Sequence, residues 1–330
     1  MMPVITLRQT NIALSLFLFG LFSCHPGQNA ITDTNTIIRQ APDSVSLFAP
    51  GLISTLFNER DLAVSPDQQE IMYTLGTNDN TFRAIVQVSL KGGKVVQKEI
   101  APFSGKYSDI EPFYAPDGQR LYFSSTRPLR ENDSTPDYNI WYAEKINGAW
   151  STTAKPISEV INSEADEYYP SLAANGNLYF TAAYLTAKGR EDIYLSRYQN
   201  GQYLLPESLD TNINSVKYEF NAFVSPKEDI LVFTSYGRPD DLGGGDLYIS
   251  TKDASGHWTK ARHAAAGINS RQLDYCPFID YQSSTFYFTS NRPPAVHDKI
   301  NLAGFEKILT GPINGMGNIY AIRLDQLLSE

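Results

Sequence analysis

Residues 161–182 read INSEADEYYPSLAANGNLYFTA, and this stretch decides the fold because its features return along the chain. The tripeptide Ile-Asn-Ser at residues 161–163 recurs at residues 213–215 and 268–270. In each copy an acid follows four residues after the Ser. A turn rich in Pro, Asn, Asp or Gly comes next, and then a short aromatic run such as Leu178-Tyr179-Phe180. Self-similarity at a regular spacing indicates a repeat architecture.

Aligning the turns places one acid in register in each of five units, 50 to 58 residues apart. These acids, the acid column, are Glu59, Asp109, Glu167, Glu219 and Asp274. Each unit holds about four short strands joined by tight turns. Four-stranded antiparallel units in series are typical of propeller blades. We therefore predict an all-β fold, a β-propeller of five four-stranded blades; a sixth blade would require a unit too degenerate to recognise.

The two ends of the chain indicate how the ring closes. The fifth unit runs out at residues 324–330 and leaves little chain for a fourth strand. Residues 49–54 precede the first unit and resemble residues 265–270. We expect this N-terminal segment to supply the outermost strand of the last blade. The outermost strands of other blades are expected near Trp150, Tyr203 and Trp258, and the propeller covers residues 45–330.

Composition supports a folded body and excludes several classes. Hydrophobic residues make up 42% of the 330 residues, which is enough to bury a core. Two Cys cannot build a disulfide scaffold, and a net charge of -9 argues against a nucleic-acid partner. Aromatic residues reach 12%, and much of this excess falls in two strand triplets per blade, where large rings would fill the wedge between neighbouring sheets.

The N-terminus carries a targeting pattern. The apolar run at residues 12–22 is too short to span a membrane and fits the central region of a secretory signal. Ser23 before Cys24 resembles a bacterial lipobox; an ordinary signal peptide with a chance Cys is the alternative. We predict a signal peptide at residues 1–23 and a lipidated Cys24 with its tether at residues 24–44. The expected location is the cell envelope, by default the outer membrane facing the periplasm.

The second unit carries a family resemblance. Asp109, the turn Ala115-Pro116-Asp117-Gly118, the run from Leu121 to Arg127 and the later Asn139-Ile140-Trp141-Tyr142 resemble the WD40-like repeats of TolB-type β-propellers. The resemblance recurs in all five units, although the first unit lacks the Arg and has Ala84 where others have Asp or Asn. It implies an envelope propeller that binds a partner and rarely performs chemistry by itself.

One face of the ring is predicted to hold the ligand. The start of each innermost strand and the loop between the second and third strands share this face, and residues 126–138, 235–245 and 291–317 form enlarged loops there. The candidate binding residues are Glu59, Asp61, Asp109, Glu111, Glu167, Glu219, Asp274, Arg127, Arg238 and Arg292. The neighbouring aromatic residues Tyr168, Tyr169, Phe220 and Tyr275 are candidates to stack on a sugar or peptide, although packing is the favoured role for most.

A structural role for the acid column is the favoured interpretation. Arg127, Arg238 and Arg292 follow the second strand at nearly matching positions, and each can pair with an acid through bidentate hydrogen bonds. Clustered carboxylates without such partners would raise one another's pKa. A functional role is more plausible for Glu59 and Glu167, whose units lack the Arg.

No enzyme motif appears, and no cofactor or metal is expected. The acidic, Gly-rich residues 240–246 favour a flexible loop over a Ca²⁺ site. Our leading hypothesis is a monomeric, non-enzymatic lipoprotein that binds an envelope protein or glycan. The alternative is a hydrolase or lyase that acts on polysaccharide through carboxylates of the same face.

Overall fold

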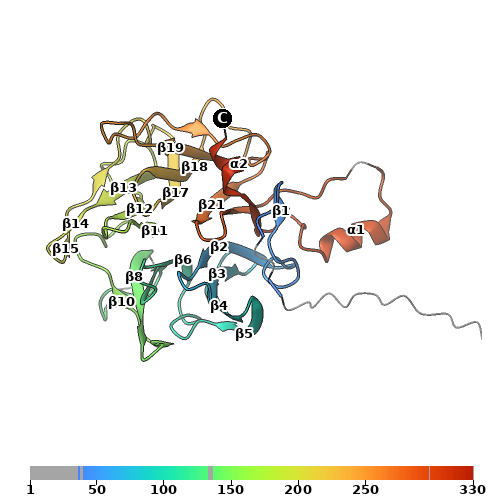
Figure 1. Ribbon diagram of the computed structural model, residues 1–330, viewed down its shortest axis with the longest axis horizontal. Helices are drawn as coiled ribbons and strands as arrows, with labels where there is room; N and C mark the ends of the chain where they lie inside the picture. Colours follow the sequence, from blue (N-terminus) through green and yellow to red (C-terminus); the bar gives the residue numbers. More distant parts are fainter. Residues whose placement is uncertain (1–35, 38–39, 133–136, 297, 330) are drawn as a thin grey trace, which may run out of the picture. The chain divides into compact units, whose positions relative to one another are not determined.

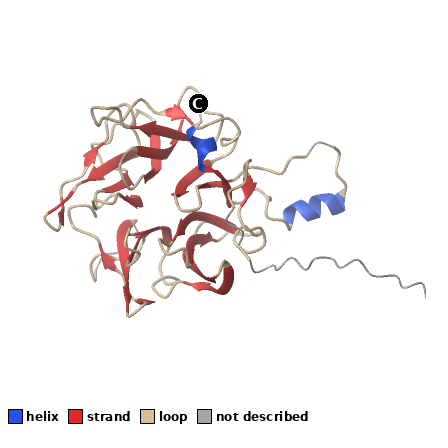
Figure 2. Ribbon diagram, in the orientation of Figure 1, coloured by secondary structure: helices blue, strands red, loops and turns tan. Residues whose placement is uncertain are grey.

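The computed structural model describes residues 36–37, 40–132, 137–296 and 298–329, which form one compact unit. Antiparallel sheets surround a common centre (Figures 1 and 2). The predicted propeller of five four-stranded blades is confirmed, and within the described ranges no sixth sheet of blade size occurs. The predicted signal peptide, Cys24 and the first part of the tether lie outside the described residues.

In each blade the first strand lies at the centre of the ring and the fourth at its edge. Blade 1 contains β2 (Asn58–Val64), β3 (Glu70–Gly76), β4 (Arg83–Lys91) and β5 (Lys94–Ile100). Blade 2 contains β6 (Asp109–Tyr114), β7 (Arg120–Ser125), β8 (Asn139–Ile146) and β10 (Lys155–Pro156), with β9 (Ala149–Trp150) paired to β8. Blade 3 contains β11 (Glu167–Leu172), β12 (Leu178–Ala182), β13 (Asp192–Ser196) and β16 (Glu207–Ser208), and the hairpin of β14 (Tyr198–Gln199) and β15 (Gln202–Tyr203) lies between β13 and β16 in the chain.

The last two blades complete the ring. Blade 4 contains β17 (Tyr218–Val224), β18 (Ile230–Tyr236), β19 (Asp246–Thr251) and β20 (Arg262–His263). Blade 5 contains β21 (Asp274–Asp280), β22 (Thr285–Ser290), β23 (Asn318–Arg323) and, as its outermost strand, β1 (Ser46–Leu47). The short helix α2 (Leu324–Leu328) follows β23.

The predicted closure by an N-terminal strand is confirmed. In the antiparallel pair of β1 and β23, Ser46 lies opposite Ala321. The N–H of Phe48 donates to the carbonyl of Ile319 at 2.9 Å. Earlier in the chain, Ile37 is buried and its N–H donates to Gly93 of blade 1. Part of the segment expected to be tether therefore packs on the propeller.

The outermost strands lie later in the chain than the sequence predicted. Trp150 is in β9 and Tyr203 is in β15, which are hairpin strands beside their blades, and Trp258 forms only an isolated bridge to Lys252. In blades 2 to 4 the outermost strand has two residues and begins about five residues later. Strands this short carry almost no hydrophobic period, so the aromatic residues were the misleading signal.

Five apolar clusters lie between neighbouring blades, one for each pair, and a sixth, of Tyr169, Tyr275 and Cys276, lies at the centre of the ring. Met72 of blade 1 packs with Phe123 of blade 2, and Tyr179 of blade 3 packs with Phe233 of blade 4. Large rings bury about 150–250 Å² each, so a few fill the widening space between two twisted sheets. This arrangement confirms that the aromatic excess fills the wedges between blades.

The three enlarged loops are confirmed, and one contains a helix that the sequence did not predict. Helix α1 (Leu302–Leu309) lies in the loop between β22 and β23, and Asn301 caps its first turn. None of its residues is buried. With no core packing, its apolar residues did not stand out from those of a loop.

The closure generates a testable expectation for Phe48. Its ring is 5% exposed and meets Tyr287 edge-on at a centroid distance of 4.8 Å. We expect Phe48→Ala to lower the free energy of unfolding by about 3 kcal/mol in urea titrations, because it leaves a cavity where the ring closes. The control is Phe82→Ala, since Phe82 is 41% exposed. Equal, small losses for both variants would show that the N-terminal segment does not hold the ring closed.

Candidate functional site

Each innermost strand has one residue with left-handed backbone, two positions after the acid of its unit. These five residues, the channel ring, are Asp61, Glu111, Tyr169, Asn221 and Cys276, with φ between 50° and 62°. Pairing with the second strand shifts register at the same place in every blade. Such bulges redirect a side chain, here at the centre of the ring, and left-handed backbone costs a non-glycine residue about 1 kcal/mol.

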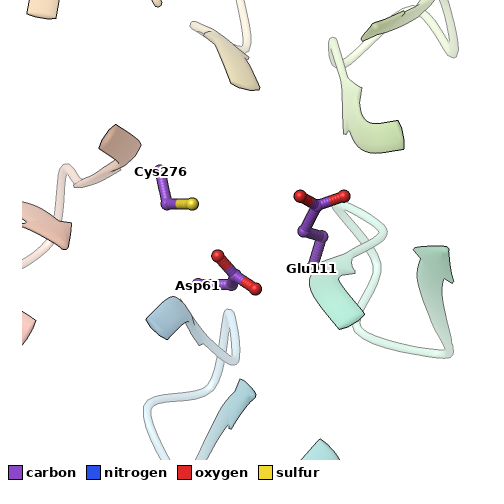
Figure 3. A group of neighbouring side chains, drawn as sticks. All are labelled: Asp61, Glu111 and Cys276. Atoms are coloured by element: carbon purple, nitrogen blue, oxygen red, sulfur yellow. The ribbon is translucent and has the colours of Figure 1, made fainter. Parts of the chain in front are cut away.

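Three members of the channel ring come together from blades 1, 2 and 5. Asp61, Glu111 and Cys276 point toward one another, and one oxygen or sulfur atom of each lies within 4.8 Å of the others (Figure 3). Arg60 links them: its Nε lies 2.7 Å from both oxygens of Asp61, and its Nη2 lies 2.9 Å from Glu111 and 3.5 Å from Cys276 Sγ. The predicted site residues Asp61 and Glu111 thus meet at the channel.

These carboxylates already have protein donors. Glu111 also accepts hydrogen bonds from the N–H of Tyr169 at 2.7 Å and from Asn221 Nδ2 at 3.0 Å. Burial raises the pKa of Glu111 to about 7, against the opposing charge of Arg60, while the Asp61 charge adds to the rise. Asp61 is 2% exposed and Glu111 is 3% exposed. A metal ion would have to displace Arg60. We therefore interpret the cluster as a structural network of hydrogen bonds and ion pairs at the centre of the channel.

The acid column has a structural role in all five blades. Each carboxylate is buried and accepts a hydrogen bond from a hydroxyl four or five residues earlier in the chain. The pairs are Thr55 with Glu59, Ser104 with Asp109, Ser163 with Glu167, Ser215 with Glu219, and Ser270 with Asp274. In four blades the backbone N–H of the same Ser or Thr also donates to the acid. The column therefore holds the loop that leads into each blade.

The expected pairing with arginine is confirmed within each blade that has one. Arg127 lies 2.7 Å from Asp109, Arg238 lies 3.0 Å from Glu219, and Arg292 lies 2.8 Å from Asp274. Each arginine also donates to a backbone carbonyl of the preceding loop.

Glu59 and Glu167, whose units lack the arginine, have no such ion pair with any residue that the structure describes. Burial raises the pKa of Glu167 to about 8, and burial also raises that of Glu59. Their candidate binding roles, like those of the other column acids, stay predictions.

A cavity of about 220 Å³ opens above the channel ring, on the face that carries the enlarged loops. We call this the mouth cavity. Its aromatic wall consists of Tyr138, Tyr168, Phe220 and Tyr275, from four blades or the loops beside them. Arg60 lies over the ring of Tyr275 at 4.9 Å, and Arg83 lies over Tyr138 at 6.0 Å. Pockets of this kind suit ligands that present an apolar face.

Two polar groups of the mouth cavity have no hydrogen bond within the described part of the chain. Tyr275 is 6% exposed, yet its hydroxyl makes none. The carboxylate of Glu191 on the opposite wall also makes none, and burial together with the nearby Asp166 raises its pKa. The ring of Tyr275 is buried, but its hydroxyl keeps access to solvent. Both groups are therefore available to a ligand.

A second hollow of about 590 Å³ adjoins the mouth cavity and shares Arg60, Leu273 and Tyr275 with it. We call it the amide groove, because its further lining includes the side-chain amides of Asn58, Asn80, Gln272 and Asn291. Asn291 Oδ1 is buried and has no hydrogen-bond partner among the described residues. Each amide can donate and accept.

The Gly-rich loop considered for Ca²⁺ is organised by its own carboxylates. Asp241 accepts from the N–H groups of Gly237 and Gly243, and Asp246 accepts from that of Leu242. Tyr248 donates to Asp240 at 2.8 Å. These contacts give the acids a role within the protein, and Ca²⁺ binding there stays a prediction.

Sequence reasoning found part of this site. It singled out Asp61, Glu111, Tyr168, Phe220 and Tyr275, but it missed Arg60, Arg83, Tyr138 and Glu191. The position of Arg60 beside the column acid was a usable signal, because the equivalent residues of the other units are apolar or aromatic. Arg83 begins β4, and Tyr138 and Glu191 directly precede β8 and β13, so all three stand where the third strand of a blade starts. Their side chains share no chemistry that would mark this position in the sequence, and only the closed ring brings them together.

Comparisons with known proteins found similar solved structures, and these say nothing about the function of the chain. No protein-family model and no curated protein sequence matches the chain. Similar solved structures include TolB from Acinetobacter baumannii, with 16% identity and a TM-score of 0.45 over 70% of this chain. The match spans only 48% of the TolB chain.

Two other similar structures carry different activities in their names. One is the catalytic domain of a GH62 α-L-arabinofuranosidase from Coprinopsis cinerea, with 11% identity, a TM-score of 0.48, and coverage of 86% of this chain and 96% of that one. The other is a puromycin-hydrolysing peptidase of Mycobacterium tuberculosis, with 11% identity, a TM-score of 0.40, and coverage of 79% and 41%. At these values neither likeness says anything about activity. Within the described residues, no helix is long and apolar enough to cross a membrane.

The raised pKa of Glu167 generates a pH expectation. The pKa of this carboxyl is 4.5 in the unfolded chain and about 8 in the folded protein, so the folded protein binds the proton more tightly. Its stabilising contribution is therefore present below pH 4.5 and is lost as the pH rises to 8. In urea titrations we expect Glu167 to lower the free energy of unfolding of the wild-type protein by about 3 kcal/mol between pH 5 and pH 8, and we expect Glu167→Gln to lack this part of the pH dependence. The exposed control Glu164→Gln should retain the loss, and a pH dependence unchanged in Glu167→Gln would contradict this account.

Proposed function

We propose that this protein is a non-enzymatic glycan-binding propeller whose ligand enters the mouth cavity. The observation that carries the proposal is a cavity with an aromatic wall and two polar groups, Tyr275 and Glu191, that lack hydrogen bonds. A sugar ring presents C–H groups on its faces and hydroxyl groups at its rim. The faces suit aromatic side chains, and each hydroxyl both donates and accepts.

The size of the cavity supports one sugar ring at a time. At about 220 Å³ it is smaller than the pockets that enclose drug-sized ligands, which begin near 300 Å³. Tyr168 and Phe220 are only partly buried, so their rings are open to a ligand from the mouth.

Hydrolysis is less well supported than binding. Glycosidases need an acid and a carboxylate that both reach the scissile bond. Asp61 and Glu111 are nearly inaccessible and their oxygens accept from Arg60, Tyr169 and Asn221. Glu191 reaches the mouth cavity, but no second accessible carboxylate of that lining faces it in the described structure.

A protein partner is the second candidate function, and a separate observation favours it. More than half of the exposed large apolar side chains of the described residues lie in or beside connections of blades 1, 3, 4 and 5, and several of them belong to the insertion with helix α1, which projects away from the ring (Figure 1). They are Leu56, Phe57, Phe82, Leu185, Val216, Tyr236, Leu242, Val296, Ile300, Leu302, Phe305 and Leu309. Exposed apolar surface of this extent is typical of interaction sites.

The proposal includes a location in the cell envelope, on the membrane through a lipid on Cys24. Its support is the sequence alone: the apolar run at residues 12–22 and the Ser23-Cys24 pair. A monomer at the outer membrane, facing the periplasm, would present the mouth to envelope polysaccharide.

Glycan binding is tested with purified protein on an array of bacterial envelope oligosaccharides. We expect at least one neutral or charged glycan to bind and Tyr168→Ala/Phe220→Ala to weaken it about tenfold, since two stacking rings are lost. Tyr198→Ala removes an exposed ring of the outer hairpin and should change nothing. Release of shorter products would favour the hydrolase, and binding to an envelope protein with no glycan bound would favour the second candidate.

Lipidation is tested by labelling cells with radioactive palmitate. We expect the wild-type chain to incorporate label and to sediment with membranes, whereas Cys24→Ser should lose both properties because it lacks the thiol. Cys276→Ser is the control, since Cys276 is buried in the channel. Equal labelling of Cys24→Ser would contradict the lipobox interpretation.

A further inference from the structure

We infer that the ligand is an uncharged oligosaccharide, with one sugar ring in the mouth cavity and the next rings along the amide groove. The inference rests on the proposed glycan-binding function and specifies its ligand. Two further observations carry it: the balance of charges around the mouth cavity and the composition of the amide groove.

The fixed charges of the mouth do not favour an anionic sugar. Arg60 is already shared between Asp61 and Glu111, at 2.7 and 2.9 Å. Arg83 donates to the carbonyl of Asn80, and Glu191 lies on the opposite wall. Two guanidinium groups thus stand among three carboxylates. Since the carboxylates outnumber the guanidinium groups, a carboxylate or sulfate on the ligand would enter a net negative environment, and Arg83, which donates only to a backbone carbonyl, is the one guanidinium group left to balance it among the described lining residues.

A cationic sugar is also disfavoured, because Arg60 and Arg83 lie over two of the four aromatic rings. An ammonium group near those rings would be repelled by the two guanidinium groups. Hydroxyl groups avoid both penalties, since a hydroxyl can donate to Glu191 and accept from Tyr275.

The amide groove extends the site in one direction. It continues from Arg60, Leu273 and Tyr275 toward Gln272 and Asn291, where amides rather than charges form the polar lining. Asn58 Nδ2 already donates to Asn80 Oδ1 at 2.8 Å, and Asn291 Oδ1 has no partner in the described structure but is closed to solvent. The side chain of Gln272, which makes no hydrogen bond in the described structure, is the amide that is free to contact a ligand. Neutral donors and acceptors at the rim of a hollow of about 590 Å³ suit the hydroxyls of further sugar rings.

The test is calorimetric titration of the purified protein with matched probes. The neutral probes are maltotriose, cellotriose, mannotriose and N,N′,N″-triacetylchitotriose with their monosaccharides; the charged probes are trigalacturonic acid and chitosan trimer. We expect at least one neutral trisaccharide to bind more tightly than its own monosaccharide and than both charged trimers.

Variants separate the two parts of the site. Glu191→Ala and Tyr275→Phe should weaken the trisaccharide and the monosaccharide about five- to tenfold, because each removes a hydrogen bond in the mouth cavity. Gln272→Ala should weaken only the trisaccharide, about fivefold. Exposed residues elsewhere supply the controls Glu164→Ala, Tyr281→Phe and Gln199→Ala.

The outcomes distinguish this inference from the function on which it rests. Tighter binding of trigalacturonic acid or chitosan trimer than of every neutral trimer would overturn the uncharged ligand and leave glycan binding intact. Equal loss of monosaccharide and trisaccharide in Gln272→Ala would overturn the role of the amide groove. If no sugar on the array or in the titrations binds, glycan binding itself fails.

Discussion

The hydrogen bond between a buried carboxylate and a hydroxyl four or five residues before it recurs at the start of every innermost strand. It ties each incoming loop to the strand that enters the centre of the ring. The left-handed residue two positions later then lies at the channel. The mouth cavity above it is lined by the residue next to the acid in each of the five innermost strands, so its shape depends on these five bonds.

Burying five carboxylates requires compensation, and the blades supply it in two ways. Three blades add an arginine that also holds the preceding loop, as Arg127 does through Asp109 and Phe103. Two blades rely on hydroxyl and N–H donors, and burial raises the pKa of their acids, as it also raises that of Asp109 in spite of Arg127. A charge removed from water needs a counter-charge or a proton. The acid column, which looked functional in the sequence, thus mainly stabilises the loops that lead into the blades. The groups open to a ligand are others, Tyr275 and Glu191.

The fold could be predicted because it is repeated. The acids, turns and aromatic triplets each appear five times, so errors in one unit are corrected by the others, and the resemblance of residues 49–54 to residues 265–270 indicated the closure. Predictions failed where the repeat is weak. The outermost strands have two residues in most blades, and helix α1 is an insertion without buried contacts. The two-residue strands leave no periodic signal, whereas the apolar residues of α1 at positions 302, 305 and 309 follow a helical period, but only over about two turns.

From the sequence alone follow the all-β class, the number of blades, the closing N-terminal strand and the pairing of acids with arginines, because these depend on spacings that repeat. Only the tertiary structure decided which polar groups remain available. Arg83, Tyr138 and Glu191 stand where the third strands of three blades start, and they have no side-chain chemistry in common. Tyr275 looks like any core tyrosine until its hydroxyl is found without a hydrogen bond in the described structure. Whether a polar group is free to bind a ligand depends on the side chains that the neighbouring blades place around it. This is a property of the closed ring rather than of any one repeat.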